Sequence, residues 1–553
     1  MPSEPHDPVP TSGSQPIAQA PRPVARGPYW IAFALLAGLV LGFAVVVVRT
    51  AWLSEDAYFT FRSVENWVYG YGARWNVAER VQVYTHPLWF GAMSLLFFVS
   101  RHMAWSAFGL SFACTAGMVY LLVRRIGGID KPATTAMAIA ILTASKAFTD
   151  YSTSGLENPL SHLLLLGFFA RFWTDEDPDP AVAERQLSLT CMFGGLLVCN
   201  RLDLGLMLAP ALVYALWPPR LSLRRVLAIG LGFAPLIVWE LISLVYYGFL
   251  VPNTAYAKLG AKLPRELVLT EGSRYFANSL RWDPITLVAV AVITVVALAQ
   301  VRGRPKQACA AVGVLLYLVY VLQVGGDYMS GRFFTAPLAV AAALLANQPK
   351  LPTWLAVAGS VVIVALAFKA PNPTVFNGPD YSKHNLKTDG HVDDERGYRH
   401  ILTGLISERK GPFLANSTWY RKGKRHRKKA EEKGKTLVVV NGNGGYMGYA
   451  AGPQIHYINP YGITDPLLAR LPGKYHAAGH IHRRPPPGYG AAALGEGPIK
   501  DPNLDAYWQD LALITRAPIW SRTRWAAIWR VHIGANQHLL DAWLATIPPD
   551  SKR

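Results

Sequence analysis

Long uncharged apolar segments recur through the first 370 residues and constrain the fold more than any other feature. Residues 31–48 contain no charged side chain, and neither do residues 284–301. The last such segment covers residues 353–368, and nothing after Lys369 resembles it. Since a helix needs about 20 mostly apolar residues to cross a bilayer, these segments predict a polytopic α-helical membrane protein with about 11 transmembrane helices.

The rest of the chain divides into two parts outside the bilayer. Residues 1–28 are rich in proline, serine, glutamine and alanine, which predicts a disordered cytoplasmic tail. Residues 29–370 form the transmembrane part, whose first apolar segment has no small-residue cleavage site and is expected to remain as a helix. Residues 371–553 predict an extracytoplasmic soluble domain of mixed α/β type, with a strand at residues 438–440.

Loop charge predicts the orientation, because short cytoplasmic loops carry an excess of lysine and arginine. With the basic loops inside, the N-terminus is cytoplasmic and the C-terminal domain lies outside a bacterial inner membrane. The apolar segment at residues 87–100 is short, so we expect it to lie at the outer surface rather than to span. The loops placed inside are residues 124–131, 218–225, 302–306 and 347–350.

The net charge of +19 fits a membrane protein with basic loops, and we expect no nucleic-acid partner. The basic run at residues 421–435 is the exception. We interpret it as a solvated loop, with anionic lipid head groups or a polyanionic polymer as alternative contacts. The C-terminal domain has no cysteine, and His476, His480 and His482 are interpreted as surface residues, so we expect no metal and no cofactor.

Acidic residues follow apolar segments at the predicted outer face. Glu55 and Asp56 are adjacent, and mutual repulsion or partial burial raises the pKa of a carboxyl group toward the range of a general base. The alternative is a helix cap at Ser54 or Asp56. Glu157 precedes a proline-initiated helix, where it is either a second acid facing Asp56 or a capping residue.

Basic and polar residues accumulate at the same face. Arg80 and His86 are suited to an anionic head group, and Arg201 with Asp203 forms a pair in an apolar context. Lys258 and Arg332 end apolar segments and are candidate phosphate ligands. Each group has an alternative without a substrate. For Arg80 and His86 it is an interfacial aromatic belt with basic anchors, and for Arg201 and Asp203 it is pairing with each other alone. For Lys258 and Arg332 it is a pair of snorkelling cations.

These motifs, in this order, resemble the GT-C superfamily of membrane glycosyltransferases, and most of all its cell-wall arabinofuranosyltransferases. Two positions depart from the family pattern: Glu55-Asp56 replaces two aspartates, and Arg201-Leu202-Asp203 replaces an arginine followed by proline and glutamate. The resembling residues are Glu55-Asp56, Asn76 with residues 79–81, and residues 153–158, 247–258, 449–453 and 464–472.

The resemblance implies transfer of a sugar, arabinofuranose, from a polyprenyl-phosphate donor to a cell-surface glycan or glycoconjugate. Asp56 or Glu55 then serves as the base, and Glu157 positions the sugar or the acceptor. The donor phosphate is expected to meet Lys258, Arg332, Arg62, His86 and Arg80. The remaining substrate contacts are Arg201, Asp203, Asn253, Asp327 and Tyr247.

One alternative is a glycan-binding scaffold that has lost its activity, although the intact acids argue against it. Two others also remain open. One is a lipid-linked sugar transporter, although the charged groups gather at one face instead of the midplane and no repeat is evident. The other is a GT-C enzyme that uses another polyprenyl-phosphate sugar with a protein or lipid acceptor. In either enzyme we expect the external domain to serve the acceptor rather than the donor.

Overall fold

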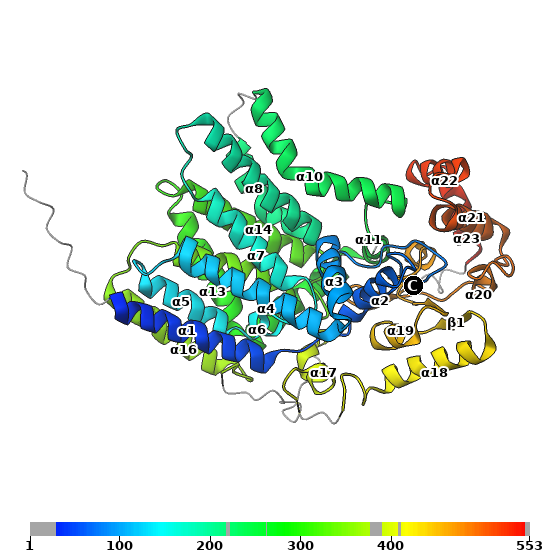
Figure 1. Ribbon diagram of the computed structural model, residues 1–553, viewed down its shortest axis with the longest axis horizontal. Coiled ribbons are helices and arrows are strands. Elements are labelled where there is room, and N and C mark those ends of the chain that lie inside the picture. Colours follow the sequence, from blue (N-terminus) through cyan, green and yellow to red (C-terminus); the bar gives the residue numbers. More distant parts are fainter. Residues whose placement is uncertain (1–28, 217–221, 261–262, 376–389, 408–410, 548–553) are drawn as a thin grey trace, which may run out of the picture.

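The computed structural model describes residues 29–216, 222–260, 263–375, 390–407 and 411–547. Helices of the first 369 residues form a bundle that fills one end of the molecule, and the C-terminal region occupies the other end (Figure 1). The polytopic helical architecture predicted from the apolar segments is therefore confirmed.

Within the described ranges, four helices are long and apolar enough to cross a membrane. A fifth span arises if α12 (Arg265–Trp282) and α13 (Pro284–Ala299) are taken together, although they meet at an angle of 106°. The four long helices are α1 (Tyr29–Thr50), α4 (Met103–Leu121, with a π turn at Leu122–Ile126), α10 (Leu223–Tyr246) and α14 (Pro305–Gln323).

Other helices of the bundle are shorter or less apolar, so the count of about 11 spans stays a prediction. The segment expected at the outer surface does form a separate helix, α3 (Pro87–Ser100), which packs against its neighbours α2 and α4. These other helices are α2 (Ala57–Val68), α3, α5 (Pro132–Ala144), α6 (Lys146–Asp150), α7 (Asn158–Phe172), α8 (Pro180–Asn200), α9 (Gly205–Leu216), α11 (Asn253–Leu259), α15 (Thr335–Ala346) and α16 (Thr353–Lys369), with 3-10 turns at Leu202–Leu204 and Arg332–Phe334.

Helix α15 lies at the centre of the bundle. Every one of its residues is buried, and it contacts α5, α7, α13 and α14. A helix that is apolar on all sides has no polar face to turn toward water, and here protein surrounds it completely. Its six alanines keep it thin, which allows the neighbouring helices to approach closely.

Three of the loops predicted to be cytoplasmic meet at one end of the bundle. The Arg304 guanidinium donates a 2.8 Å hydrogen bond to the Asn347 carbonyl, and Lys131 reaches the same carbonyl at 3.4 Å. Lys306 donates to the carbonyl of Thr174 at 2.9 Å. The loops that charge alone placed on one side therefore do lie together, and their cytoplasmic location stays a prediction.

The C-terminal region has the expected mixed α/β character. Strands β1 (Leu437–Val440) and β2 (Ile455–Ile458) pair in parallel, with α19 (Gly445–Ala451) as the crossover between them. Strands β3 (Lys474–Ala477) and β4 (His480–His482) form an antiparallel pair. The other helices are α17 (Glu395–Thr403), α18 (Thr418–Lys433), α20 (Tyr489–Ala492), α21 (Pro502–Arg516), α22 (Arg522–His532) and α23 (Gln537–Thr546), with a 3-10 turn at Leu468–Arg470.

The basic run at residues 421–435 is not the loop that we expected, because most of it lies in α18. The Ser417 side chain caps the helix by accepting a hydrogen bond from the Tyr420 amide. Gly434, with φ of 60°, ends the helix in the left-handed conformation. Gly423 and Ala430 are buried against the neighbouring helix α19, and this packing stabilises a segment of poor apolar content.

The C-terminal region packs on the loops of the bundle that the sequence predicts to be external. Trp75 from the first of these loops shares a hydrophobic cluster with Met447 and Tyr457. Phe249 shares another with Ile514 and Ile528 of the last helices. The domain boundary near residue 371 stays a prediction, but the two parts contact each other through apolar clusters that neither part could complete alone.

Candidate functional site

A cavity of about 400 Å³ opens where the start of α2 meets the C-terminal region. Glu55, Asp56, Phe59 and Tyr328 are its lining residues from the bundle. The C-terminal region supplies the rest of the wall, from within residues 390–399, 442–444, 461–463 and 476–480. The two parts of the chain therefore build one polar chamber.

Asp56 is the bundle's acid in this cavity that has no cationic partner among the described residues. It stands at the N-cap position of α2, yet its side chain makes no capping hydrogen bond, contrary to the capping alternative. No ion pair within 4.0 Å joins it to any of the described residues. An accessible carboxylate without a cationic partner is available to accept a proton.

Glu55 is held in place by the C-terminal region. Its carboxylate forms a 2.8 Å ion pair with Arg399, and the side chain is mostly buried. Burial raises the pKa of Glu55, an effect that Arg399 and the backbone amides of Tyr446 and Gly445 oppose. The adjacent acids thus have different surroundings, one fixed by an arginine and the other open to the cavity.

Glu395 is an acid of the site that the sequence analysis missed. It is buried in the cavity wall, and Arg399 bridges it to Glu55 with an Nε–carboxylate distance of 3.4 Å. Burial, assisted by the nearby charges of Glu55 and Asp56, raises the pKa of Glu395 to about 8. The available signal was the acidic run at residues 393–395, just beyond the apolar part of the chain.

Aromatic rings and a cation form another side of the cavity. His480 lies between Tyr328 and Tyr461, with ring centroids 4.6 and 4.9 Å away, so it is a half-buried cavity residue, whereas His476 and His482 are exposed as expected. Burial and the charge of Lys258 lower the pKa of His480. The Lys258 ammonium lies 3.1 Å from where a Cβ on Gly479 would stand, so glycine leaves room for the lysine beside the cavity.

Glu157 lies at the centre of a buried charged network next to this cavity. Its carboxylate accepts from Arg201 at 3.0 Å and Arg332 at 3.1 Å, and it lies 3.2 Å from His86. Its side chain does not cap α7, contrary to the capping alternative. Burial alone raises the pKa of a carboxyl group, but Arg332, His86 and Arg201 hold the pKa of Glu157 well below its usual range.

The partners of Glu157 connect outward to further residues predicted from the sequence. Arg201 also forms a two-pronged pair with Asp203 at 2.9 and 2.7 Å, and Arg332 lies 3.5 Å from Asp327. His86 Nε2 contacts the Thr60 hydroxyl at 2.8 Å. Because a carboxylate only accepts hydrogen bonds, the proton of a neutral His86 belongs on the Nδ1 atom that faces Glu157.

Four other predicted residues hold elements together outside the cavity wall. Arg62 donates to the backbone carbonyls of Trp75, Gly448 and Ile455. The other three make comparable contacts: Arg80 with the Ile514 and Ala517 carbonyls, Asn253 with the Gly462, Ile463 and Asp465 carbonyls, and Tyr247 with the Tyr84 hydroxyl and the Ala73 carbonyl.

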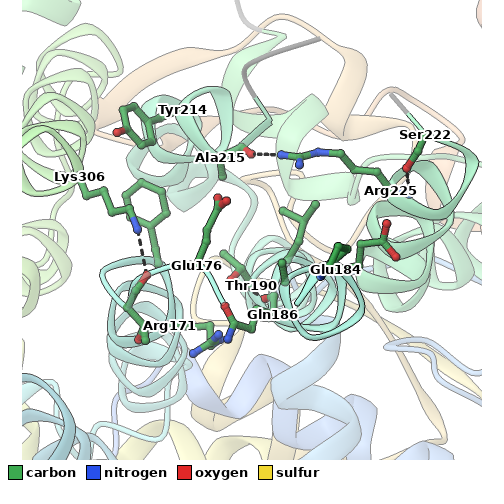
Figure 2. Close-up of a pocket in the computed structure, with 15 residues that line it drawn as sticks. Arg171, Glu176, Glu184, Gln186, Thr190, Tyr214, Ala215, Ser222, Arg225 and Lys306 are labelled. Atoms are coloured by element: carbon green, nitrogen blue, oxygen red, sulfur yellow. Dashed lines mark hydrogen bonds between the residues drawn. The ribbon is translucent and has the colours of Figure 1, made fainter. Parts of the chain in front are cut away.

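A second cavity, of about 270 Å³, lies between α7, α8, α9 and α10 (Figure 2). Lys306 and Arg225 extend along its walls and bond to the carbonyls of Thr174 and Ala215 (Figure 2). None of the site residues predicted from the sequence lines it. It belongs to the end of the bundle where the basic loops meet, so the acid-lined cavity is the candidate active site.

The fold and site define an integral membrane protein whose acid-lined cavity is closed by its C-terminal region. No family model matches the chain. The chain is similar to the terminal beta-(1->2)-arabinofuranosyltransferase of Mycobacterium tuberculosis, at 28% identity over 330 residues, covering 52% of this chain and 51% of the relative. It is also similar to the terminal beta-(1->2)-arabinofuranosyltransferase of Corynebacterium glutamicum, at 28% identity over 369 residues, covering 58% and 52%.

The chain spans about half the length of these curated relatives. Their names confirm the resemblance to arabinofuranosyltransferases that the motifs indicated. Solved structures that align with the chain include the apo oligosaccharyltransferase of Archaeoglobus fulgidus, with a TM-score of 0.47 and 13% identity over 79% of this chain and 65% of that one. ArnT from Cupriavidus metallidurans bound to undecaprenyl phosphate aligns with a TM-score of 0.46 and 14% identity, over 77% and 85%.

Proposed function

We propose that the protein is a membrane glycosyltransferase that moves a sugar from a polyprenyl-phosphate donor to a cell-surface glycan. The similarity to the two arabinofuranosyltransferases favours arabinofuranose as the sugar. The observation that carries the proposal is the cavity with the unpaired carboxylate of Asp56 on its wall, beside a buried network of arginines. The reaction takes place on the extracytoplasmic face, with the C-terminal region outside.

Asp56 is the proposed base in this reaction. It takes the proton of the acceptor hydroxyl while the new glycosidic bond forms at the anomeric carbon and the bond to the phosphate oxygen breaks. The electron pair leaves with polyprenyl phosphate, so the charges balance without an additional reactant. Glu55, fixed by Arg399, is the second candidate for the base.

Cations next to the cavity are the proposed contacts of the donor phosphate. Arg332 is shared between Glu157 and Asp327 and its Nε has no hydrogen-bond partner among the described residues, so it retains a donor for a ligand. Lys258 at the cavity edge supplies a second positive charge. Neutralising the leaving phosphate stabilises the charge that develops as the sugar departs.

Glu157 is proposed to position the basic residues around it. Its carboxylate keeps Arg201 and Arg332 charged and oriented, while His86 is bound on both ring nitrogens. Arg62, Arg80, Asn253 and Tyr247 contribute by holding the external loops to the C-terminal region. The aromatic rings of Tyr328 and Tyr461 offer stacking surfaces for a sugar.

The test is release of polyprenyl phosphate by the purified full chain supplied with a polyprenyl-phosphoryl-arabinofuranose donor and a glycan acceptor. We expect release that depends on the acceptor, with the sugar recovered on the glycan. A hexose donor serves as the matched control for sugar choice. Transport of the intact donor across a vesicle membrane without any release would contradict the proposal.

A further inference from the structure

Helix α18 carries the densest positive charge of the chain. Seven of the nine residues from 421 to 429 are arginine or lysine, and all seven side chains are exposed. In Figure 1 the helix lies along the edge of the C-terminal region, apart from the apolar helices of the bundle. The role proposed for the cavity leaves this helix unused.

The helix has one packed face and one charged face. Gly423 and Ala430 are buried against α19, and a Cβ on Gly423 would stand 2.3 Å from the Met447 carbonyl oxygen. On the opposite side, basic residues recur at the spacing i, i+3, i+4 and i+7, which aligns them in one stripe. We call this stripe the basic face; it consists of Arg421, Lys424, Arg425 and Lys428.

The basic face is largely uncompensated. Lys428 pairs with Glu432 at 3.8 Å, a contact between two exposed side chains that solvent screens. In the part of the chain that the structure describes, no acidic side chain pairs with the other three residues of the face. Like charges at i, i+4 destabilise a helix, and Arg421 in the first turn opposes the helix dipole. A bound polyanion would relieve both effects.

The packing of α18 distinguishes a polymer from a lipid surface. Helices that lie on a membrane insert an apolar face below the head groups. The face of α18 opposite the charges is already covered by α19, so that face is not available to insert into a membrane. The residues before α19, 442–444, line the acid-lined cavity, so the basic face lies one helix away from it.

We propose that the basic face of α18 binds an anionic polymer, a chain that carries phosphate or carboxylate groups, in the aqueous phase beside the cavity. Charge complementarity along the stripe provides the attraction, and the extended spacing of the cations suits a chain with repeated anionic groups. The binding stands independently of the proposed sugar transfer.

The experiment measures binding of fluorescent linear polyphosphate, and separately of polygalacturonate, to the full chain in nanodiscs of uncharged lipid. The test variant replaces the basic face with glutamine, a residue of similar helix propensity. The matched control removes four exposed charges elsewhere in the C-terminal region. The test substitutions are Arg421→Gln, Lys424→Gln, Arg425→Gln and Lys428→Gln; the control substitutions are Lys474→Gln, Arg484→Gln, Lys500→Gln and Arg522→Gln.

We expect the test variant to bind at least one polymer at least about tenfold more weakly at about 0.1 M salt, and the control to change by no more than about twofold. Wild-type binding should weaken steeply as salt increases. Equal losses in both variants, no loss in the test variant, or salt-independent wild-type binding would each overturn the proposal.

A membrane role is tested with a third probe, phosphatidylglycerol vesicles, offered to the same variants. If the test variant loses affinity only for phosphatidylglycerol vesicles and keeps its affinity for both polymers, the face binds lipid and the proposal is wrong. Circular dichroism of each variant reports whether α18 and its surroundings remain folded. Because no sugar transfer is measured, failure here leaves the proposed function untouched.

Discussion

Asp56 differs from its neighbours in lacking a charged partner, and this difference predicts its effect on activity. The change Asp56→Asn should lower sugar transfer by roughly 10²–10⁴-fold, because it removes the proton acceptor while preserving shape. Release of polyprenyl phosphate by the purified variant measures the effect. Donor binding and thermal unfolding should stay close to those of the wild type, since the side chain caps no helix and pairs with no described cation.

The matched comparison for this residue is Glu55→Gln. That variant loses the ion pair with Arg399, so it should change stability as well as rate. Near-normal turnover of Asp56→Asn together with an inactive Glu55→Gln would transfer the role of base to Glu55.

Glu395 predicts a pH effect on stability. Its pKa is raised from 4.5 to about 8, so between these values the folded chain holds a proton that the unfolded chain has released. The free energy of unfolding contributed by this group therefore falls as pH rises from about 5 to 8. Glu395→Gln should remove this fall. Between about pH 5 and 8, the free energy of unfolding of the variant should change by roughly 1–3 kcal/mol less than that of the wild type.

The measurement is the unfolding midpoint of wild type and variant in detergent at several pH values. The exposed Glu496 gives the control, because Glu496→Gln should parallel the wild type throughout. Parallel curves for Glu395→Gln as well would show that the carboxyl group of Glu395 titrates normally in the folded protein.

At the scale of elements, α2 carries both a cavity acid and the residue that joins the two parts. Arg62 is 2% exposed and donates to three backbone carbonyls, two of them in the C-terminal region. Arg62→Gln should cost about 3 kcal/mol or more, because buried carbonyls lose their donors. Thermal unfolding and limited proteolysis between the two parts measure the loss, with the exposed Arg522→Gln as the control.

The same variant tests the phosphate role predicted from the sequence. If Arg62→Gln folds with normal stability but binds the donor poorly, then Arg62 contacts phosphate and the interface role is wrong. Helix geometry already favours the interface: Arg62 lies six positions after Asp56, which rotates its side chain by about 240° around the helix axis.

The elements that could be predicted from the sequence are those that local composition determines. Residues 31–48 lie in α1 and residues 284–301 begin with α13, because an uncharged run specifies a helix regardless of distant contacts. Helix α18 escaped prediction since only Gly423 and Ala430 reveal its packed face, and their burial depends on α19. The number of spans stays a prediction, because helices such as α5 and α15 are shorter than a membrane is thick and their length alone does not show whether they cross it.

The site was predictable to the extent that its residues follow apolar segments. Four of the candidate residues begin or end a helix at the same predicted face: Asp56, Glu157, Arg201 and Arg332. Ionisable residues at a membrane face tend to be functional, and this rule selected all four. Glu395 and Arg399 reach the cavity by tertiary packing of a region distant in sequence. No local pattern could pair Arg399 with Glu55 across more than 300 residues.

At the scale of the whole molecule, the meeting of the basic loops predicts one orientation. A reporter fused after Arg304 should be active only if it functions in the cytoplasm, and one fused after Arg553 only if it functions outside. A pair of reporters with opposite requirements measures both sites. The reverse pattern at both positions would mean that the helix at residues 87–100 spans the membrane.

Complete enclosure of α15 has a consequence for how the chain is made. The helices that contact it most, α5, α7, α13 and α14, all precede it in the sequence and therefore leave the ribosome earlier. They must therefore leave space for α15, or separate again, until α15 has been synthesised. A larger residue in place of one of its alanines should therefore reduce the yield of assembled protein, with less effect on the insertion of each separate helix into the membrane, because α15 packs between neighbours that were all made before it.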